Sequence, residues 1–244
     1  MLTKAQSKYI RSLGTSAGRR THATFLVEGH KLAEEWLAGN PGSIELIVAS
    51  EEWIDGQNLS PELLAKTLLT TDFQRAALTF LQTTPPVLFV VNQPAPPPLP
   101  VSGWVIAGEC LQDPGNMGTL LRIADWYGIA HVVTSPDSAD FWNPKVVQSA
   151  MGAHLRVHVQ RTPLEKFLAE TKLPVIAATL EGKPVQEQPP LPAGILLLGN
   201  ESRGLSPELL RYATVQCSIP RRGGAESLNV AVAGGILCDR LIPL

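Results

Sequence analysis

The feature that most restricts the fold is a regular alternation of short β-rich runs and helical patterns in the second half of the chain. The β-rich runs are residues 104–107, 131–134, 155–159, 175–178, 195–198 and 215–219. The helical patterns are residues 118–127, 145–151, 164–170, 207–212 and, at the end, 228–241. Strands that alternate with helices form a mainly parallel sheet with helices on both faces. The sequence therefore predicts an α/β fold, with ligands bound beyond the carboxyl ends of the strands.

A proline-rich segment at residues 92–101 separates this region from the first 91 residues. Proline removes backbone donors and favours extended polyproline geometry, so the segment is predicted to be a semi-rigid linker. Before it, the patterns predict strands at 25–27, 44–48 and 87–91 and helices at 4–13, 30–37 and 72–81. We therefore expect a small α/β or α+β domain at residues 1–91 and a larger α/β domain at residues 102–244.

Composition excludes several classes of protein. A hydrophobic content of 44% and a charged content of 17% are typical of a soluble globular chain. The longest apolar runs, such as residues 195–198, are too short to cross a bilayer, and no apolar segment follows the N-terminal lysines, so neither a membrane span nor a signal peptide is expected. Cys110, Cys217 and Cys238 lack C-x-x-C spacing, which predicts no disulfide framework or zinc site and indicates a reducing cytoplasm.

The net charge of −2 alone argues against a nucleic-acid partner, but the charges are unevenly distributed. Residues 1–31 hold six basic side chains and one acid, whereas the rest holds 14 basic and 21 acidic residues. The basic ones are Lys4, Lys8, Arg11, Arg19, Arg20 and Lys31. A basic arm on a mildly acidic body can contact phosphates locally. The open alternative is a solvated helix face followed by a polar loop.

Two loops at predicted strand ends gather polar residues. In residues 113–122, Pro114 and Gly115 form a turn, Asn116 can cap the helix that follows, and Arg122 lies on that helix. In residues 198–205, Glu201 lies between Gly199 and Gly204, which let the backbone approach a ligand closely. The structural alternatives are a capped helix with an exposed arginine and an ordinary strand–loop–helix turn.

A third loop, residues 219–233, follows the last strand. Arg221 and Arg222 precede a flexible pair of glycines, and Ser227 or Asn229 can cap the final helix. Other motifs are missing from the sequence, since there is no G-x-G-x-x-G after a strand, no P-loop and no G-x-S-x-G. His154 and His158 are four residues apart, but residues 152–159 alternate like a strand, so a metal site is not expected.

In their order and position, these three loops resemble the three motifs of the SpoU methyltransferases, a branch of the SPOUT superfamily. The resembling segments are residues 116–122 (NMGTLLR), 198–204 (LGNESRG), and 219–220 (IP) with 227–231 (SLNVA). The resemblance covers residues 102–244. Residues 1–91 are more loosely similar to the L30e-like RNA-binding domain that many relatives carry, especially in Arg20 and residues 25–29 (FLVEG). Ile123 departs from the family, which usually has a small or polar residue there.

The resemblance implies an RNA 2′-O-ribose methyltransferase that uses S-adenosyl-L-methionine, has a deep trefoil knot formed by its C-terminal segment, and acts as a homodimer. Ribosomal RNA is the favoured substrate. Transfer RNA, a non-catalytic RNA-binding relative and a nucleotide-dependent metabolic enzyme remain as alternatives. No metal is implied, because the cofactor itself carries the reactive methyl group.

The resemblance also assigns roles to residues. The implied catalytic residues are Arg122, Asn116, Glu201, Ser227 and Asn229. The implied cofactor-binding residues are Thr179, Leu198, Gly199, Gly204, Ile219 and Leu228. The basic arm adds Lys4, Lys8, Arg11, Arg19 and Arg20 as RNA-binding residues. In the family the arginine of the first motif is the favoured general base. Because removing a proton from arginine at pH 7 costs about 7 kcal/mol, a charged Arg122 that clamps the phosphate and stabilises the alkoxide is the second interpretation.

Overall fold

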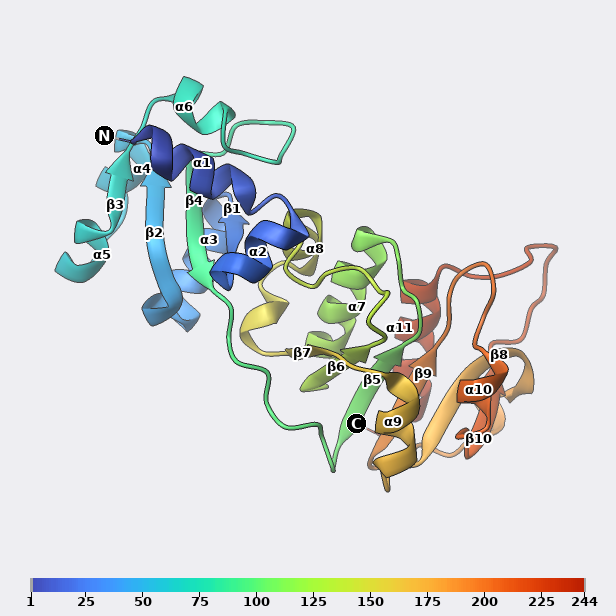
Figure 1. Cartoon of the computed structure of the whole chain (residues 1–244). Helices are drawn as coiled ribbons and strands as arrows, with labels where there is room; N and C mark the ends of the chain where they lie inside the picture. The colour runs from blue at the N-terminus through green and yellow to red at the C-terminus, as the bar shows by residue number, and fades with distance from the viewer. Residues whose placement is uncertain (1, 244) are drawn as a thin grey trace. The chain divides into compact units, whose positions relative to one another are not determined.

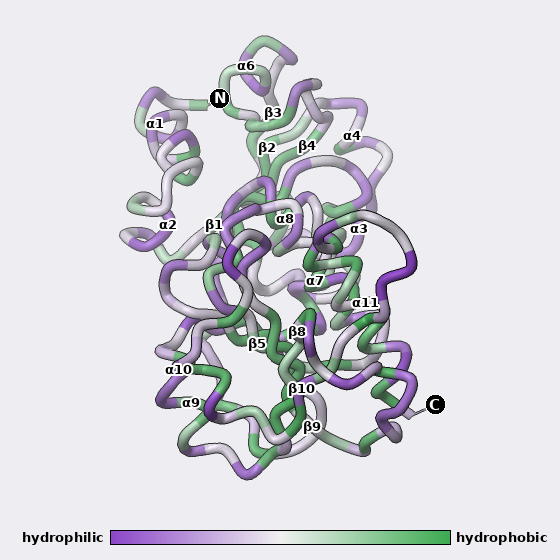
Figure 2. Tube along the Cα trace, turned by 90° about the vertical axis from the view of Figure 1, so that its right-hand side faces the viewer, coloured by the Kyte–Doolittle hydropathy of each residue, from purple (hydrophilic) through white to green (hydrophobic). Residues whose placement is uncertain are grey.

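The computed structural model describes residues 2–243 and divides into two compact units (Figure 1). The first unit comprises Met1–Ala95 with Asp140–Leu155, and the second comprises Pro96–Ala139 with Arg156–Leu244. The strands of both units are predominantly hydrophobic, whereas the connecting loops are largely polar (Figure 2). No helix among residues 2–243 is both long and apolar enough to span a membrane.

The first unit is built on a four-stranded sheet of order β1-β4-β2-β3. Strands β1 (Thr24–Glu28) and β2 (Ile44–Ala49) pair antiparallel with β4 (Val87–Asn92), and β3 (Thr67–Leu69) pairs parallel with β2. All of β1 and the first five residues of β4 are buried. The predicted strands at 25–27, 44–48 and 87–91 are therefore confirmed, and β3 is an addition.

Helices cover both faces of this sheet. On one face, α3 (His30–Gly39) packs Leu32 and Trp36 against Phe25. On the other, α1 (Lys4–Ser12) packs Ile10 against Leu26. The remaining helical segments are α2 (Ser16–His22), η1 (Pro41–Ser43), α4 (Glu51–Asp55), α5 (Pro61–Ala65) and α6 (Asp72–Ala76).

Helix α6 is shorter than the predicted helix at 72–81. It ends at Ala76, and the chain then turns toward β1, where the carboxylate of Glu28 accepts hydrogen bonds from the Thr79 hydroxyl and the Phe80 N–H. A buried carboxylate therefore binds the residues that the pattern assigned to the last turn of the helix.

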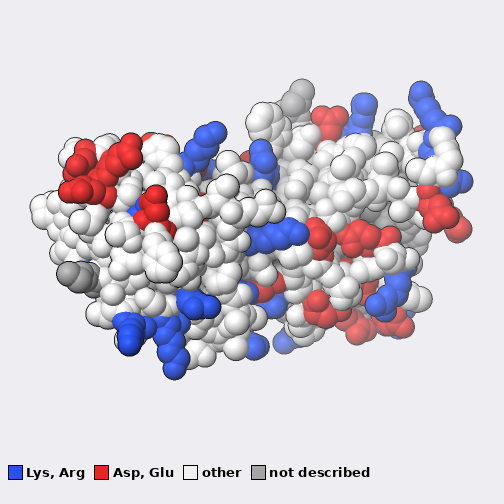
Figure 3. Space-filling model, turned by 90° about the horizontal axis from the view of Figure 1, so that it is seen from above, with Lys and Arg blue, Asp and Glu red and all other residues white. Residues whose placement is uncertain are grey.

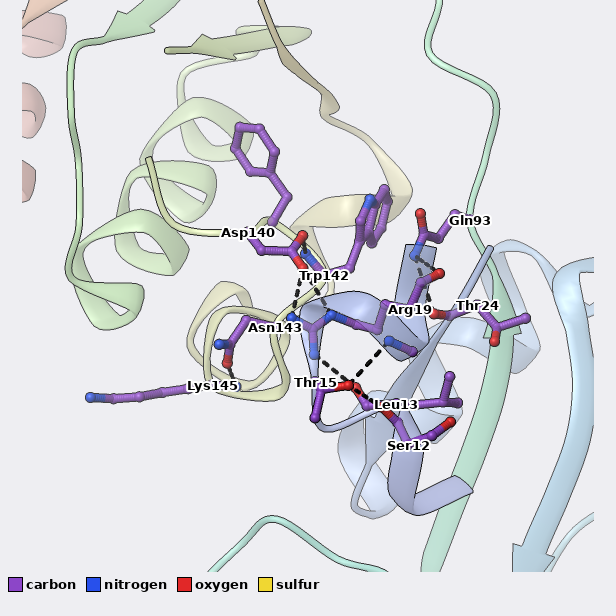
Figure 4. A network of polar contacts seen from close by, with 12 residues as sticks. Ser12, Leu13, Thr15, Arg19, Thr24, Gln93, Asp140, Trp142, Asn143 and Lys145 are labelled. Atoms are coloured by element: carbon purple, nitrogen blue, oxygen red, sulfur yellow. Dashed lines mark hydrogen bonds and ion pairs between the residues drawn. The ribbon is translucent and has the colours of Figure 1, made fainter. Parts of the chain in front are cut away.

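Residues 140–155 belong to the first unit although they lie between strands of the second. They form α8 (Pro144–Ala150) and η2 (Ala153–Leu155). Figure 4 shows how they are held, with Arg19 donating from Nε and Nη2 to Oδ2 of Asp140 at 2.9 and 2.6 Å. The Trp142 ring lies 4.6 Å from that of Phe25 between centroids. The first compact unit thus extends beyond the predicted boundary at residue 91 and includes a segment that the sequence places after the linker.

The predicted strand at 155–159 is shifted in the structure. His154 lies in η2, buried in the first unit with its Nε2 at 2.9 Å from the Phe141 carbonyl oxygen, whereas His158 begins β7 in the second unit. The expectation that His154 and His158 share one strand is therefore wrong, because burial of the His154 ring ends the extended pattern. Among residues 2–243, no group of three His, Cys, Asp or Glu side chains is arranged to hold a metal ion.

The second unit is built on a six-stranded sheet of order β10-β8-β9-β5-β6-β7, in which every neighbouring pair is parallel. Its strands are β5 (Trp104–Gly108), β6 (His131–Thr134), β7 (His158–Arg161), β8 (Val175–Pro184), β9 (Gly194–Leu198) and β10 (Val215–Ser218). Strands β5 and β9 are buried over their whole length, as central strands of a sheet covered on both faces should be. The predicted parallel α/β fold is confirmed, and the trefoil knot stays a prediction.

The helices of the second unit lie on both faces of this sheet (Figure 1). Helices α9 (Leu164–Glu170) and α10 (Pro207–Leu210) pack on one face. Helices α7 (Pro114–Trp126) and α11 (Val230–Leu241) pack against each other on the opposite face, and η3 (Val185–Glu187) contacts α11. A Cβ atom at Gly234 would lie 2.8 Å from Leu120 Cδ2, so a small residue there lets α11 approach α7 closely.

Candidate functional site

The loops after β5 and β9 leave the sheet side by side. Gly108 and Leu198 are paired in register at the ends of these strands, and the Glu109 N–H donates to the Leu198 carbonyl at 2.8 Å. One residue further, the side-chain Nδ2 of Asn200 donates to the Cys110 carbonyl at 2.9 Å. Because backbone and side-chain bonds both cross between the loops, the two motifs are held together beyond the carboxyl edge of the sheet.

The β9 loop is a tight closed turn. Asn200 and Gly204 exchange backbone hydrogen bonds of 3.1 and 2.9 Å, and Asn200 Oδ1 accepts from the N–H groups of Ser202 and Arg203. Gly204 has a φ of +69°, which favours glycine. A Cβ at Gly199 would lie 2.4 Å from the carbonyl carbon of Gly204, so the closure itself requires glycine there.

The start of α7 differs from the sequence expectation. Asp113, not Asn116, caps the helix, and its Oδ1 accepts from the Asn116 N–H at 2.8 Å. Asn116 instead lies in the first turn, and its side-chain amide is available for other contacts. The correction has a local reason, because Pro114 occupies the first helical position and the residue before it is then the cap.

The freed amide of Asn116 joins the three predicted motifs. Its Nδ2 donates to Oε1 of Glu201 at 2.5 Å, and its Oδ1 accepts from Nδ2 of Asn229 at 2.8 Å. Oδ1 of Asn229 in turn caps α11 by accepting from the N–H groups of Ala231 and Val232 at 3.0 and 3.3 Å. Three residues separated by 85 and 113 positions therefore lie in direct contact, and we call them the Asn229–Asn116–Glu201 chain.

The other two predicted catalytic residues lie outside this chain of contacts. Arg122 is exposed on α7, and Ser227 is exposed in the loop before α11. Within the part of the chain that the structure describes, neither side chain forms a hydrogen bond or ion pair, so both are available to a ligand. Ser227 does not cap α11, since Asn229 does.

The predicted cofactor-binding residues surround the same edge of the sheet. Leu198 is buried, Ile219 is half-buried directly after β10, and Leu228 is 46% exposed. Thr179 lies in β8 just where that strand leaves its register with β10, which jumps from Ala177 to Lys183. The buried hydroxyl of Thr179 lacks a hydrogen-bond partner among the described residues, which is unusual for a polar group away from water.

A polar cluster behind the β5 loop escaped the sequence analysis. Cys110 has a φ of +52°, and its N–H donates to Oγ of Ser135 at 2.7 Å. A hydrogen bond to Asp137 raises the pKa of the Cys110 thiol, and hydrogen bonds from Ser135 and then Cys110 lower the pKa of Asp137. The thiol is therefore protonated at neutral pH, and the cluster braces the loop. The one signal in the sequence for this cluster is that Cys110 and Ser135 each follow a predicted strand, at 104–107 and 131–134.

The basic residues of the first unit divide into two kinds. Lys4, Lys8 and Arg11 are exposed on α1 and Arg20 is exposed on α2, and basic side chains gather on the surface of this unit in Figure 3. Arg19 is only 2% exposed and donates to Asp140 and to the Leu13 carbonyl. The expectation that Arg19 binds RNA is therefore corrected, because its guanidinium is buried and hydrogen-bonded inside the unit.

The similarity to known proteins extends over both units. A model of the SpoU rRNA Methylase family matches residues 104–239. The 23S rRNA (guanosine(2553)-2′-O)-methyltransferase RlmP of Bacillus subtilis is 34% identical over 235 residues, which are 95% of this chain and 93% of that protein. A solved TrmH-family structure from Porphyromonas gingivalis has a TM-score of 0.88 at 36% identity and covers 99% of this chain and 98% of that one. The AdoMet-bound rRNA methyltransferase from Sinorhizobium meliloti has a TM-score of 0.86 at 26% identity, with 98% and 95% covered.

Proposed function

Because the chain belongs to the SpoU rRNA Methylase family, we propose that it transfers a methyl group from S-adenosyl-L-methionine to a ribose 2′-oxygen of ribosomal RNA. The observation that carries the proposal is the Asn229–Asn116–Glu201 chain, which brings the three family motifs into contact at the carboxyl edge of a parallel sheet. Ribosomal RNA is favoured because a relative that is 34% identical over 95% of this chain is named as a 23S rRNA enzyme.

The residues at this edge fit the proposed cofactor. Adenosine requires apolar walls with a few polar groups that orient it, and Ile219 and Leu228 supply apolar surface at the ends of β10 and α11. The unpaired Thr179 hydroxyl can take a ligand hydrogen bond, and the space beside Gly204, where a side chain would otherwise start, is open. When bound, the cofactor supplies an electrophilic methyl on a sulfonium. The Sinorhizobium meliloti structure is described as AdoMet-bound, which supports the same assignment.

The chain's own residues would position the ribose and stabilise charge. The Asn229–Asn116–Glu201 chain leaves one carboxylate oxygen of Glu201 without a contact to Asn116, and this oxygen can accept a hydrogen bond from a sugar hydroxyl. As the 2′-oxygen takes the methyl group from the sulfonium sulfur, which keeps the electron pair of the broken bond, the hydroxyl proton would pass to the Glu201 oxygen that accepts its hydrogen bond. A charged guanidinium at Arg122 would stabilise the developing alkoxide and hold the neighbouring phosphate. Ser227, exposed beside Leu228, is proposed to contact the substrate.

The enzyme is proposed to act as a homodimer through α7 and α11. Trp126 is 84% exposed, and Val232 and Ile236, one turn apart on α11, are also exposed. Ile123 packs near Gly235 between the two helices, at 3.6 Å from the position of a Cβ there. We take these exposed apolar side chains as the proposed interface, since contiguous apolar surface on a monomer marks association sites. Ile236→Glu should then give a monomer in sedimentation velocity. A dimer that persists in this variant would contradict the assignment of the face.

The first unit is proposed to be an L30e-like domain that selects the RNA through Lys4, Lys8, Arg11 and Arg20. Deleting residues 1–91 is a poor test, because residues 140–155 would lose the core against which they pack. Charge removal on α1 is better suited. The proposed site of action is the cytoplasm, where ribosomal RNA is found and where three free cysteines persist.

The function is tested with full-length protein, labelled S-adenosyl-L-methionine, and ribosomal and transfer RNA from cells that lack this gene product. We expect ribose methylation of ribosomal RNA. Arg122→Ala should abolish turnover while calorimetry still shows cofactor binding, and Asn116→Ala should reduce turnover by at least about tenfold, the equivalent of one lost hydrogen bond of about 1.4 kcal/mol. Methylation of transfer RNA alone would overturn the substrate assignment. Cofactor binding without any methylation would favour the non-catalytic alternative.

A further inference from the structure

The first unit contains a hollow of about 470 Å³ between α1 and α6. Residues of α1 and the residue before its cap form one side, and residues of α6 and the turn after it form the other. The lining residues are Leu2, Lys4, Ser7, Lys8, Arg11, Phe73, Gln74, Ala77 and Leu78. A volume of this size is within the range of small-ligand sites. It lies far along the chain from the Asn229–Asn116–Glu201 chain and belongs to a different unit.

One side of the hollow is a row of cations. Lys4, Lys8 and Arg11 follow one another at intervals of four and three residues, which places them on one face of α1, spread over about 10 Å along its axis. The helix that carries them is fixed, because Thr3 and Gln6 form a capping box and Ile10 is buried in the core. Among residues 2–243, none of the three cations forms an ion pair, so their charges are not neutralised within the protein.

The other side presents an exposed aromatic ring. Phe73 is 85% exposed, yet the turn that carries it is firmly held. Thr71 and Gln74 form a second capping box, and the buried guanidinium of Arg75 donates to the carbonyl oxygens of Thr70 and Pro85. A single exposed apolar side chain is ordinary on a protein surface. A rigidly mounted ring beside three unpaired cations is a different arrangement, since it offers a flat apolar face and positive charge to the same ligand.

The acids nearby do not cancel this positive charge. No Asp or Glu lines the hollow. Asp72, which precedes Phe73, is paired with Arg75, and Glu45 accepts a hydrogen bond from the Tyr9 hydroxyl at 2.9 Å. The ligand that fits is therefore an anion with a flat apolar group. In an RNA methyltransferase, which is the proposed function on which this step rests, an unpaired nucleotide has that chemistry.

We infer that this hollow binds an unpaired base of the RNA substrate, stacked on Phe73, while Lys4, Lys8 and Arg11 hold the phosphates on either side. Stacking of bases on aromatic side chains with cations along the backbone is how proteins hold single-stranded nucleic acids. The base must be unpaired, because a base inside a duplex has both faces covered by its neighbours. The first unit thereby selects loops or strand ends in the RNA over continuous helices.

The test measures binding of full-length protein to an eight-nucleotide single-stranded RNA that carries 2-aminopurine, and to an RNA duplex of equal length. Phe73→Ala should weaken single-strand binding about tenfold and abolish the change in 2-aminopurine fluorescence. Phe73→Trp should retain both, and Phe73→Leu, which keeps apolar surface without a ring, should behave like alanine. Leu64→Ala, which removes another exposed apolar side chain on α5 outside the hollow, is the matched control and should bind as the wild type does.

The cations are tested by the salt dependence of the same binding. Replacing Lys8 or Arg11 with alanine should each reduce the slope of log K against log salt by about 0.7, the value for one phosphate on a single strand. Lys31→Ala on α3, which lies outside the hollow, should leave the slope unchanged. Equal single-strand binding by Phe73→Ala and Leu64→Ala would overturn the inference, even if the wild type methylates ribosomal RNA. A wild type that binds the single strand through Phe73 but methylates no RNA would overturn the proposed function and leave the hollow as a nucleotide site.

Discussion

Replacing Arg19 with alanine tests how the first unit holds the segment 140–155. The guanidinium of Arg19 is 2% exposed and Asp140 is 11% exposed, so solvent screens their ion pair weakly. Arg19 also donates to the Leu13 carbonyl at 2.7 Å. Alanine would leave a buried carboxylate without its counter-charge and a carbonyl without its donor. Breaking one side of a buried pair costs about 3–5 kcal/mol, a large part of the 5–15 kcal/mol that stabilises a typical domain.

The loss is measured by urea unfolding followed through tryptophan fluorescence, since Trp36, Trp53 and Trp142 all lie in the first unit. Arg20→Ala is the matched control, because Arg20 is the next residue on α2 and its side chain is exposed. This variant should change the unfolding free energy by less than about 0.5 kcal/mol. The double variant Arg19→Ala with Asp140→Ala should be more stable than the sum of the single changes predicts, because no lone charge stays buried. A loss below about 1 kcal/mol for Arg19→Ala would refute the reasoning.

Three further predictions concern protonation and loop closure. Burial lowers the pKa of His154 to about 4 from 6.5, so the unfolded chain binds a proton that the folded chain does not as pH falls through this window. The free energy of unfolding should therefore drop by up to about 3 kcal/mol between about pH 6.5 and about pH 4. His154→Gln should remove most of this drop when the free energy of unfolding is measured against pH. The same drop in the variant as in the wild type would contradict the role of His154. Burial raises the pKa of Glu28, so the folded protein favours the protonated side chain. The contribution of Glu28 to the free energy of unfolding is therefore largest at low pH and declines as pH rises. Glu28→Gln should thus gain more stability at pH 8 than at pH 4 in thermal unfolding, and an equal change at both values would contradict this cause. Gly199→Ala should weaken cofactor binding at least about tenfold in calorimetry, because the added carbon meets the backbone of Gly204. Gly223→Ala is the control, because the added carbon there enters open space. Equal cofactor affinities of the two variants would show that closure of the Gly199–Gly204 loop does not determine cofactor binding.

The regular strands and the longer helices were predictable because their side chains repeat with a clear period. The predicted helix at 164–170 matches α9, and the predicted strand at 131–134 matches β6. The missed elements are α2, α4, α5, β3 and the short helices η1, η2 and η3, which have three to seven residues each. Seven residues make two helical turns at most, so an apolar face hardly repeats. Their Ser and Thr caps were visible, but such residues are also common in turns.

The packing of residues 140–155 in the first unit could not be predicted from local patterns. Arg19 and Asp140 are 121 residues apart, and each occurs in a segment that is unremarkable for its composition. An arginine next to another arginine near the N-terminus indicates a basic arm, and Arg20 fits that prediction. What separates the two is a single position on α2, which turns Arg19 toward the core and Arg20 toward solvent.

The orientation of the site follows from one helix cap. Oδ1 of Asn229 is occupied by two N–H groups of α11, so this side chain can offer only its Nδ2 group to Asn116. Asn116 must then accept with Oδ1, and its own Nδ2 group is directed at Glu201. Each amide has one donor end and one acceptor end, so the direction set at α11 is transmitted through Asn116 to the carboxylate. An aspartate at 229 would cap α11 equally well but has no donor for Asn116. The choice of asparagine at that position is therefore explained by the contact with Asn116 and not by the helix.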